Sequence, residues 1–110
     1  MAIKHSDLEI TNDEFQNVIM SKTHKLVVVD FFAEWCMPCL ILAPIIEDLS
    51  KNMKDVKFVK IDVDDNAELA SKHKIHSIPC LVIFKDGKEV DRIIGTQSSD
   101  YIEQRINSCL

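Results

Sequence analysis

Residues 26–33 read LVVVDFFA, a nearly continuous run of β-branched and aromatic side chains. A run of this kind, without alternation between apolar and polar residues, is typical of a strand that is buried on both faces. Such strands occur mainly in parallel sheets that helices cover on both sides. The segment therefore predicts a central strand, and it requires covering helices elsewhere in the chain.

The rest of the chain alternates between helical and extended patterns. Helices are predicted over residues 11–22, 39–53, 64–74 and 98–110, and further strands over 8–10, 56–64, 80–84 and 88–94. The order β-α-β-α-β-α-β-β-α predicts an α/β fold with a mixed five-stranded sheet flanked by four helices. We expect residues 1–110 to form a single domain, with residues 1–7 as a short polar N-terminal segment.

Composition narrows the classes of function. The chain has 110 residues, 46% hydrophobic and 28% charged, as in globular domains. The start of the chain has no apolar stretch of the kind that signal peptides contain, and no apolar run is long enough for a bilayer, so we expect a soluble cytoplasmic protein. The net charge is −5, and the charges are well mixed, which argues against binding to nucleic acid.

Two cysteines, Cys36 and Cys39, follow the central strand within the stretch AEWCMPCL. As a structural staple, their disulfide would close a very short loop, gain about 2 kcal/mol and not be expected to persist in the cytosol. As half of a zinc site, the pair would need a second pair at close spacing. His73, His76 and Cys80 lie far downstream and do not form one, so neither alternative is favoured.

The position of the pair favours redox chemistry. It lies where a buried strand passes into a long helix, and the first helical turn offers free N–H groups and the positive end of the helix dipole. This environment stabilises a thiolate, which is the reactive form of cysteine. We therefore expect Cys36, nearer the helix start, to be the more exposed and attacking thiolate. Cys39, buried one turn further in, would resolve the mixed disulfide.

The chain resembles the thioredoxin family over about residues 8–109. The resemblance rests on VVVDFFAEWCMPC, a helix proline at Pro44, VKIDVD, SIPCLVIFKDGK and IIG. It implies the thioredoxin fold and a protein-disulfide reductase that maintains cell redox homeostasis, with no cofactor beyond the redox-active Cys36–Cys39 pair and no metal. It also implies disulfide-containing client proteins, an upstream thioredoxin reductase and a monomer. The alternatives are a disulfide oxidant or isomerase and a docking module that does not turn over.

The resemblance assigns further roles near the cysteines. Asp30 would be a buried acid that handles the proton of Cys39, and Lys60 would face it; otherwise Asp30 reaches solvent at a strand end and Lys60 is an ordinary solvated lysine. Pro79 would follow a cis bond that presents the backbone of Ile78 to clients; otherwise it is an edge-strand proline. Trp35 and Gly95 would complete the apolar docking surface, although Trp35 could equally be a packing residue.

Several positions depart from the family pattern. Met37 replaces the usual glycine between the cysteines and precedes the retained Pro38, Leu40 replaces a lysine, and Cys80 replaces a threonine after Pro79. We expect Met37 to add a flexible apolar contact for clients and to shift the reduction potential. Cys80 is expected to lie near the sulfur pair, either as a small buried hydrophobe or as an additional thiol that regulates the site.

Overall fold

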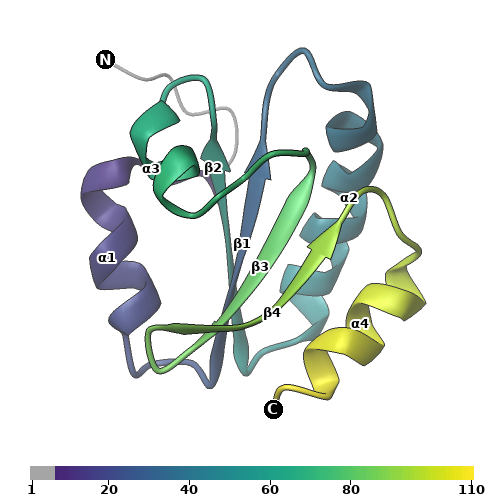
Figure 1. The fold of residues 1–110 in the computed structure, drawn as a ribbon. Helices are drawn as coiled ribbons and strands as arrows, with labels where there is room; N and C mark the ends of the chain where they lie inside the picture. Colours follow the sequence, from purple (N-terminus) through teal and green to yellow (C-terminus); the bar gives the residue numbers. More distant parts are fainter. Residues whose placement is uncertain (1–6) are drawn as a thin grey trace.

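The computed structural model describes residues 7–110, so the polar N-terminal segment falls outside the described residues except for Asp7. Within this range the chain forms helices α1 (Asn12–Met20), α2 (Met37–Asn52), α3 (Ala67–Lys72) and α4 (Ser99–Asn107). The strands are β1 (Leu26–Phe32), β2 (Val56–Asp62), β3 (Cys80–Lys85) and β4 (Lys88–Ile94). Figure 1 shows the sheet between two pairs of helices, which confirms the predicted α/β architecture.

The sheet of the described residues is mixed and has the strand order β2-β1-β3-β4. β1 pairs in parallel with β2, whereas β3 pairs antiparallel with both β1 and β4. The predicted fifth strand at residues 8–10 is wrong. Those residues make an isolated bridge to Lys60 through two backbone hydrogen bonds of 2.9 Å, and the chain then enters α1. Three residues are too few to extend the ladder further.

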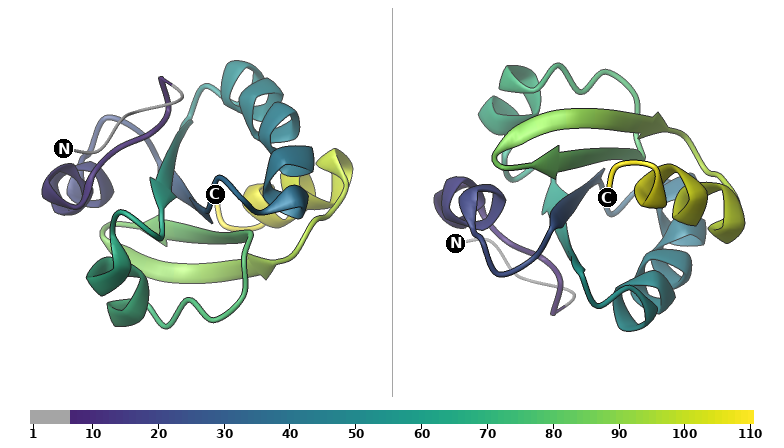
Figure 2. Two further views of the ribbon diagram at one scale, coloured as in Figure 1. Left: turned by 90° about the horizontal axis from the view of Figure 1, so that it is seen from above. Right: turned by 90° about the horizontal axis from the view of Figure 1, so that it is seen from below.

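The central strand β1 is buried along its whole length, as its composition predicts. Helices α1 and α3 cover one face of the sheet, and α2 and α4 cover the other (Figure 2). Each face has its own apolar core. The first gathers Phe15 and Ile19 of α1 with odd-numbered β1 residues such as Phe31, and the second gathers Leu42 and Ile46 of α2 with the opposite face of the sheet.

Two local features concern the helices themselves. The backbone N–H of Thr11 donates to the Glu14 carboxylate at 3.1 Å, which caps the start of α1. Pro44 lies inside α2, and the helix continues through it to Asn52. None of the helices in residues 7–110 combines the length and apolarity that crossing a membrane requires.

Adjacent residues on α2 provide a test of this packing. Leu42 is fully buried, whereas Ile41 is 60% exposed. We expect Leu42→Ala to lower the free energy of unfolding by about 2–5 kcal/mol, because it leaves a cavity between α2 and the sheet. Ile41→Ala should change it by no more than about 0.5 kcal/mol. Urea denaturation measures both, and equal losses would contradict the placement of α2.

Candidate active site

The cysteine pair lies where β1 passes into α2, at the upper end of the sheet in Figure 1. Cys36 is the N-cap of α2, with extended backbone, and Pro38 occupies the first turn, where its missing N–H leaves no gap. Cys36 and Cys39 form a disulfide with a Cα–Cα distance of 5.2 Å. The backbone N–H of Cys39 donates to Sγ of Cys36 at 3.2 Å. The predicted junction of strand, cysteine pair and helix is confirmed.

Burial of the two cysteines differs from the expectation. Both are 4% exposed, so the prediction that Cys36 is the more exposed is wrong for this disulfide form. The pair packs in a small apolar cluster with Phe32 and Ala33. Helix position alone did not predict this burial, because Val63 and Ile78, which pack against the cluster, come from other parts of the chain.

Asp30 lies on β1, six residues before Cys36, and its side chain is buried at 1% exposure. Neither carboxylate oxygen has a hydrogen-bond partner among residues 7–110. Desolvation raises the pKa of Asp30 to about 7, and the charge of Lys60 opposes this increase. The alternative in which this acid reaches solvent at a strand end is wrong. A carboxyl group with this pKa can take up or release a proton at neutral pH.

Lys60 is directly opposite Asp30 in the parallel register of β1 and β2. It is 8% exposed, so it is not an ordinary solvated lysine. Its Nζ lies 4.5 Å from the centroid of the Phe32 ring. Lys60 and Cys39 both line a cavity of about 380 Å³, with Leu40 at its wall. The charge of Lys60 therefore acts on the buried Asp30, and the cavity that Lys60 lines also reaches Cys39.

The cis peptide bond expected at Ile78-Pro79 is present. Ile78 packs against the cluster that contains the disulfide. The carbonyl oxygen of Pro79 accepts a hydrogen bond of 2.9 Å from the backbone N–H of Gly95. The Thr96 hydroxyl donates to the carbonyl oxygen of Pro38 at 3.2 Å. These contacts bring the segment after α3, the end of β4 and the start of α2 together around the sulfur pair.

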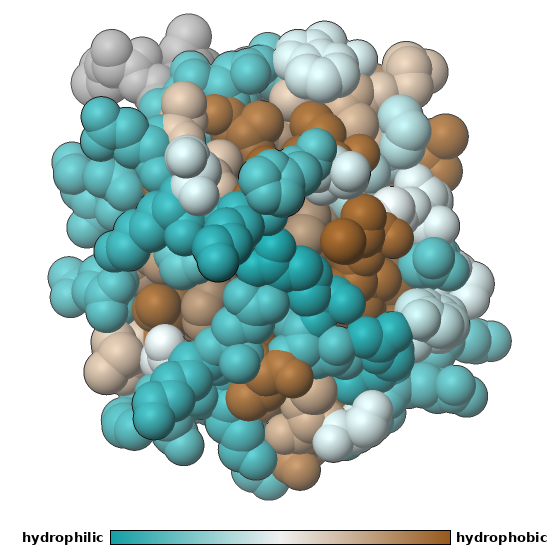
Figure 3. Space-filling view, in the orientation of Figure 1, coloured by the Kyte–Doolittle hydropathy of each residue, from teal (hydrophilic) through white to brown (hydrophobic). Residues whose placement is uncertain are grey.

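Trp35 and Met37 project from this region into solvent, at 70% and 64% exposure. The exposure of Trp35 excludes the alternative of a core packing residue. Its indole Nε1 donates to Asp64 at 2.8 Å, a partner that the sequence analysis did not single out. Figure 3 shows hydrophobic residues interrupting the hydrophilic surface in the upper half of the view, the end where β1 passes into α2.

Cys80 is a small buried residue, as one of its two expected roles requires. It is 1% exposed and belongs to the core under α1 and α3, together with Phe31 and Val82. Cys36 and Cys39 belong to a separate cluster. Phe31 and Cys80 are register partners on one face of the sheet, and Asp30 and its partner Leu81 are on the other. Burial also raises the pKa of the Cys80 thiol, so this position favours packing over regulation.

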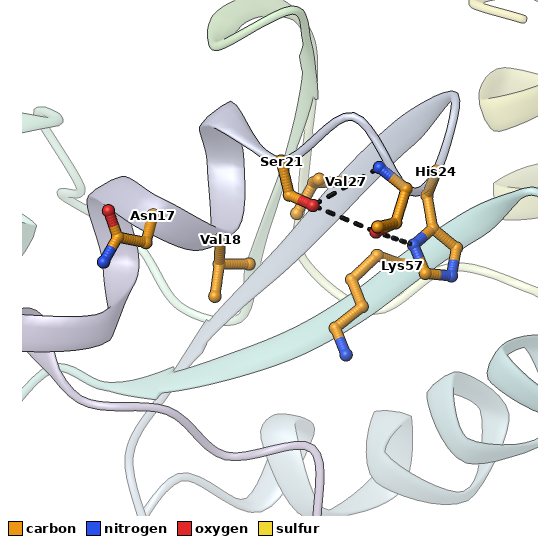
Figure 4. A pocket seen from close by; sticks show the side chains of 7 residues that line it. Asn17, Val18, Ser21, His24, Val27 and Lys57 are labelled. Carbon is orange, nitrogen blue, oxygen red and sulfur yellow. Dashed lines mark hydrogen bonds between the residues drawn. The ribbon is translucent and has the colours of Figure 1, made fainter.

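The described residues contain two further features, and Glu9 of the second also lines the cavity that Cys39 and Lys60 share. A cavity of about 250 Å³ lies between α1 and the far end of β1, lined by residues such as Asn17, Ser21, His24 and Lys57 (Figure 4). Glu9, Asp62 and Asp65 each place one carboxylate oxygen within 4.8 Å of the other two. Acidic groups of this kind are common without an ion, and none of these residues was predicted as a site residue.

The cysteine pair can store two electrons as thiols and release them when the disulfide forms. The fold and the site together thus define a thiol–disulfide oxidoreductase. A family model described as thioredoxin matches residues 6–108, and the chain belongs to the thioredoxin family. The protein therefore carries out reversible dithiol–disulfide exchange at Cys36 and Cys39.

Individual relatives agree with this assignment. The thioredoxin of Mycoplasmoides gallisepticum is 49% identical over 86 residues, which cover 78% of this chain and 85% of that protein. The thioredoxin of Chlamydia pneumoniae is 42% identical over 98 residues, which cover 89% and 93%. The solved structure of Fasciola hepatica thioredoxin superposes with a TM-score of 0.83 at 40% identity, covering 91% of this chain and 95% of that one.

The buried acid predicts a pH dependence of stability. The pKa of Asp30 rises from 3.8 to about 7 on folding, so the folded protein binds more protons between these values. Its free energy of unfolding therefore falls as pH rises through this range, by up to roughly 4 kcal/mol from this group. We expect Asp30→Asn to stabilise the oxidised protein at about pH 8.5 and to have a much smaller effect at about pH 4.

Urea denaturation of the oxidised protein at both pH values measures this difference. Asp48→Asn, at an exposed acid on α2, is the matched control and should leave the pH dependence unchanged. A gain for Asp30→Asn that is equal at both pH values would contradict the assigned ionisation.

Proposed function

We propose that Cys36 is the attacking thiolate and Cys39 the resolving thiol of a protein-disulfide reductase. The observation that carries the proposal is the position of Cys36 Sγ at the N-cap of α2, where it accepts the N–H of Cys39. In the reduced protein, this donor and the helix dipole favour the charged form of the Cys36 sulfur. The sulfur of Cys39 is not at the N-cap, because Cys39 lies inside the first turn of α2.

The exchange transfers two electrons to the client. The Cys36 thiolate attacks one sulfur of the client disulfide, which breaks that bond, forms a mixed disulfide and releases the first client thiolate. Cys39 then loses its proton and attacks Cys36, which releases the second client thiolate and leaves the Cys36–Cys39 disulfide. A reductase that supplies two electrons must restore the dithiol, and we propose an upstream thioredoxin reductase for this step.

Asp30 and Lys60 are proposed to assist the second step. Cys39 must lose a proton before it attacks, and a buried carboxylate with a pKa of about 7 is suited to accept it at neutral pH. Lys60 opposes protonation of Asp30 through its charge and shares a cavity with Cys39. That cavity of about 380 Å³ gives a route by which the proton can leave the site.

The surface around the disulfide is proposed to bind an extended client segment. Ile78 packs at the sulfur pair and precedes the buried Pro79, and its backbone is proposed to pair with a client strand. The exposed Trp35 and Met37 offer apolar contacts beside it, and Gly95 holds Pro79 in place. We propose that the protein acts in the cytoplasm as a monomer on disulfide-containing proteins, without binding to nucleic acid or membranes.

A dithiothreitol-driven insulin reduction assay tests the proposed activity. We expect the unmodified protein to reduce insulin, and we expect Cys36→Ser to abolish the reaction because no attacking thiolate remains. Cys109→Ser is the matched control, since this half-buried thiol follows α4, packs against the core between the sheet and helices α2 and α4, and donates to the Arg105 carbonyl oxygen. The absence of activity in the unmodified protein would instead support a docking module that does not turn over.

Cys39→Ser distinguishes the roles of the two cysteines. This variant should still attack a client disulfide but lack the thiol that resolves the intermediate. We expect a covalent adduct between Cys36 and the client, detected by mass spectrometry and released by dithiothreitol. If Cys36→Ser formed the adduct through Cys39 while Cys39→Ser did not, the two roles would have to be exchanged.

A further inference from the structure

Arg92 on β4 ties the chain after α3 to the sheet. Its Nη2 donates to the carbonyl oxygen of His73 at 2.8 Å, and its Nη1 donates to that of Lys74 at 3.1 Å. His73 is the C-cap of α3, where the last carbonyl groups of a helix lack partners within the helix. Lys74 has a φ of 56°, in the left-handed region, so the chain turns there. The guanidinium thus holds the first residues of the loop that leads to β3.

Glu89 on the same strand fixes the orientation of this guanidinium. Its Oε2 accepts from Nε of Arg92 and its Oε1 from Nη2, both at 2.8 Å. The side chains are 23% exposed for Arg92 and 37% for Glu89, so the pair is partly shielded from solvent. A bidentate ion pair of this type is specific in geometry as well as attractive. Arg92 is therefore presented to the loop in a single orientation.

The same segment of chain also holds the other end of the loop. Gly95, three residues after Arg92, donates its N–H to the carbonyl oxygen of Pro79 at 2.9 Å. Gly95 has a φ of 86°, a conformation that favours glycine. Between the two anchors lies the client-facing Ile78. Arg92 of β4 thus fixes the loop at its start, and Gly95, the residue after β4, fixes it at its end.

We propose that Arg92 is a positioning residue for client binding, held by Glu89 and acting through the loop that carries Ile78 and Pro79. The inference rests on the proposed docking role of these two residues. An extended client must pair with a backbone that is already ordered, since ordering it during binding costs conformational entropy. Arg92 makes no contact with the disulfide in the described structure, so its effect should fall on client binding and not on exchange between sulfurs.

Arg92→Met removes the guanidinium while keeping an unbranched side chain. Arg105→Met is the matched control, because Arg105 also makes a bidentate ion pair with a β4 acid, Asp91, but joins β4 to α4 instead of the loop. Arg92→Lys keeps the charge without the planar fork, and Glu89→Gln removes the carboxylate that orients Arg92. Thermal or urea denaturation establishes that each variant is folded under assay conditions.

The readout compares insulin with a small aromatic disulfide that needs no extended docking. For Arg92→Met we expect KM for insulin to rise about fivefold to tenfold with kcat nearly unchanged, because two charge-assisted hydrogen bonds that order the loop are lost. The loss in kcat/KM for the small disulfide should be clearly smaller. Arg92→Lys and Glu89→Gln should give intermediate increases in KM, and Arg105→Met should give none.

The outcomes separate this inference from the proposed function. If Arg92→Met raised the insulin KM no more than Arg105→Met, or slowed both substrates equally, the positioning role would be overturned while the reductase activity stood. If Arg92→Met proved too unstable to assay, the insulin KM of Arg92→Lys and Glu89→Gln would decide, and unchanged values would overturn the role. If the unmodified protein reduced the small disulfide but not insulin, the proposed docking of protein clients would fail, and the role of Arg92 with it.

Discussion

The hydrogen bond from the Cys39 backbone N–H to the Cys36 sulfur is the interaction on which the proposed function depends. It exists because β1 is buried on both faces and delivers the chain directly to the start of α2, with Cys36 as the N-cap. A sulfur placed there meets backbone donors and the positive end of the helix dipole. The sheet, the covering helices and the loop before β3 all serve to hold partners around that sulfur.

The site carries a cost in stability. Asp30 is buried without a hydrogen-bond partner among the described residues, and its only nearby compensation is the charge of Lys60. An uncompensated buried carboxylate is destabilising when it ionises, which is why its pKa rises. The same property suits it to exchange a proton at neutral pH. The fold tolerates the acid because β1 is supported by apolar cores on both faces.

Much of this organisation could be predicted from the sequence, because it depends on local patterns. The apolar run of β1, the alternating elements and the position of the cysteine pair follow from residue types and spacing. The family resemblance predicted the burial of Asp30 and the cis bond before Pro79. Features that depend on tertiary packing could not be predicted in this way. The equal burial of Cys36 and Cys39 depends on which residues cover them, and only the fold decides between the two roles expected for Cys80.

The prediction of a strand at residues 8–10 was wrong for a related reason. Its pattern fits a strand, but α1 begins immediately afterwards and limits it to one bridge. The role proposed for Arg92 could not be predicted from the sequence either, because a charged residue on the last strand is common at an exposed sheet edge. Its partners, Glu89 and the carbonyl groups after α3, are brought together only by the fold. The position of Ile78 beside the disulfide, which gives the loop its proposed role, is likewise visible only in the structure.

The Cys36–Cys39 pair is proposed to donate electrons to client disulfides. The most direct test of this proposal is the equilibrium reduction potential of the pair, measured against a glutathione or dithiothreitol redox buffer. We expect a reduction potential of about −270 mV, the range of thioredoxin, because the helix start stabilises the Cys36 thiolate moderately. A potential of about −120 mV, the range of the strong disulfide oxidants, would contradict the proposed reductase function.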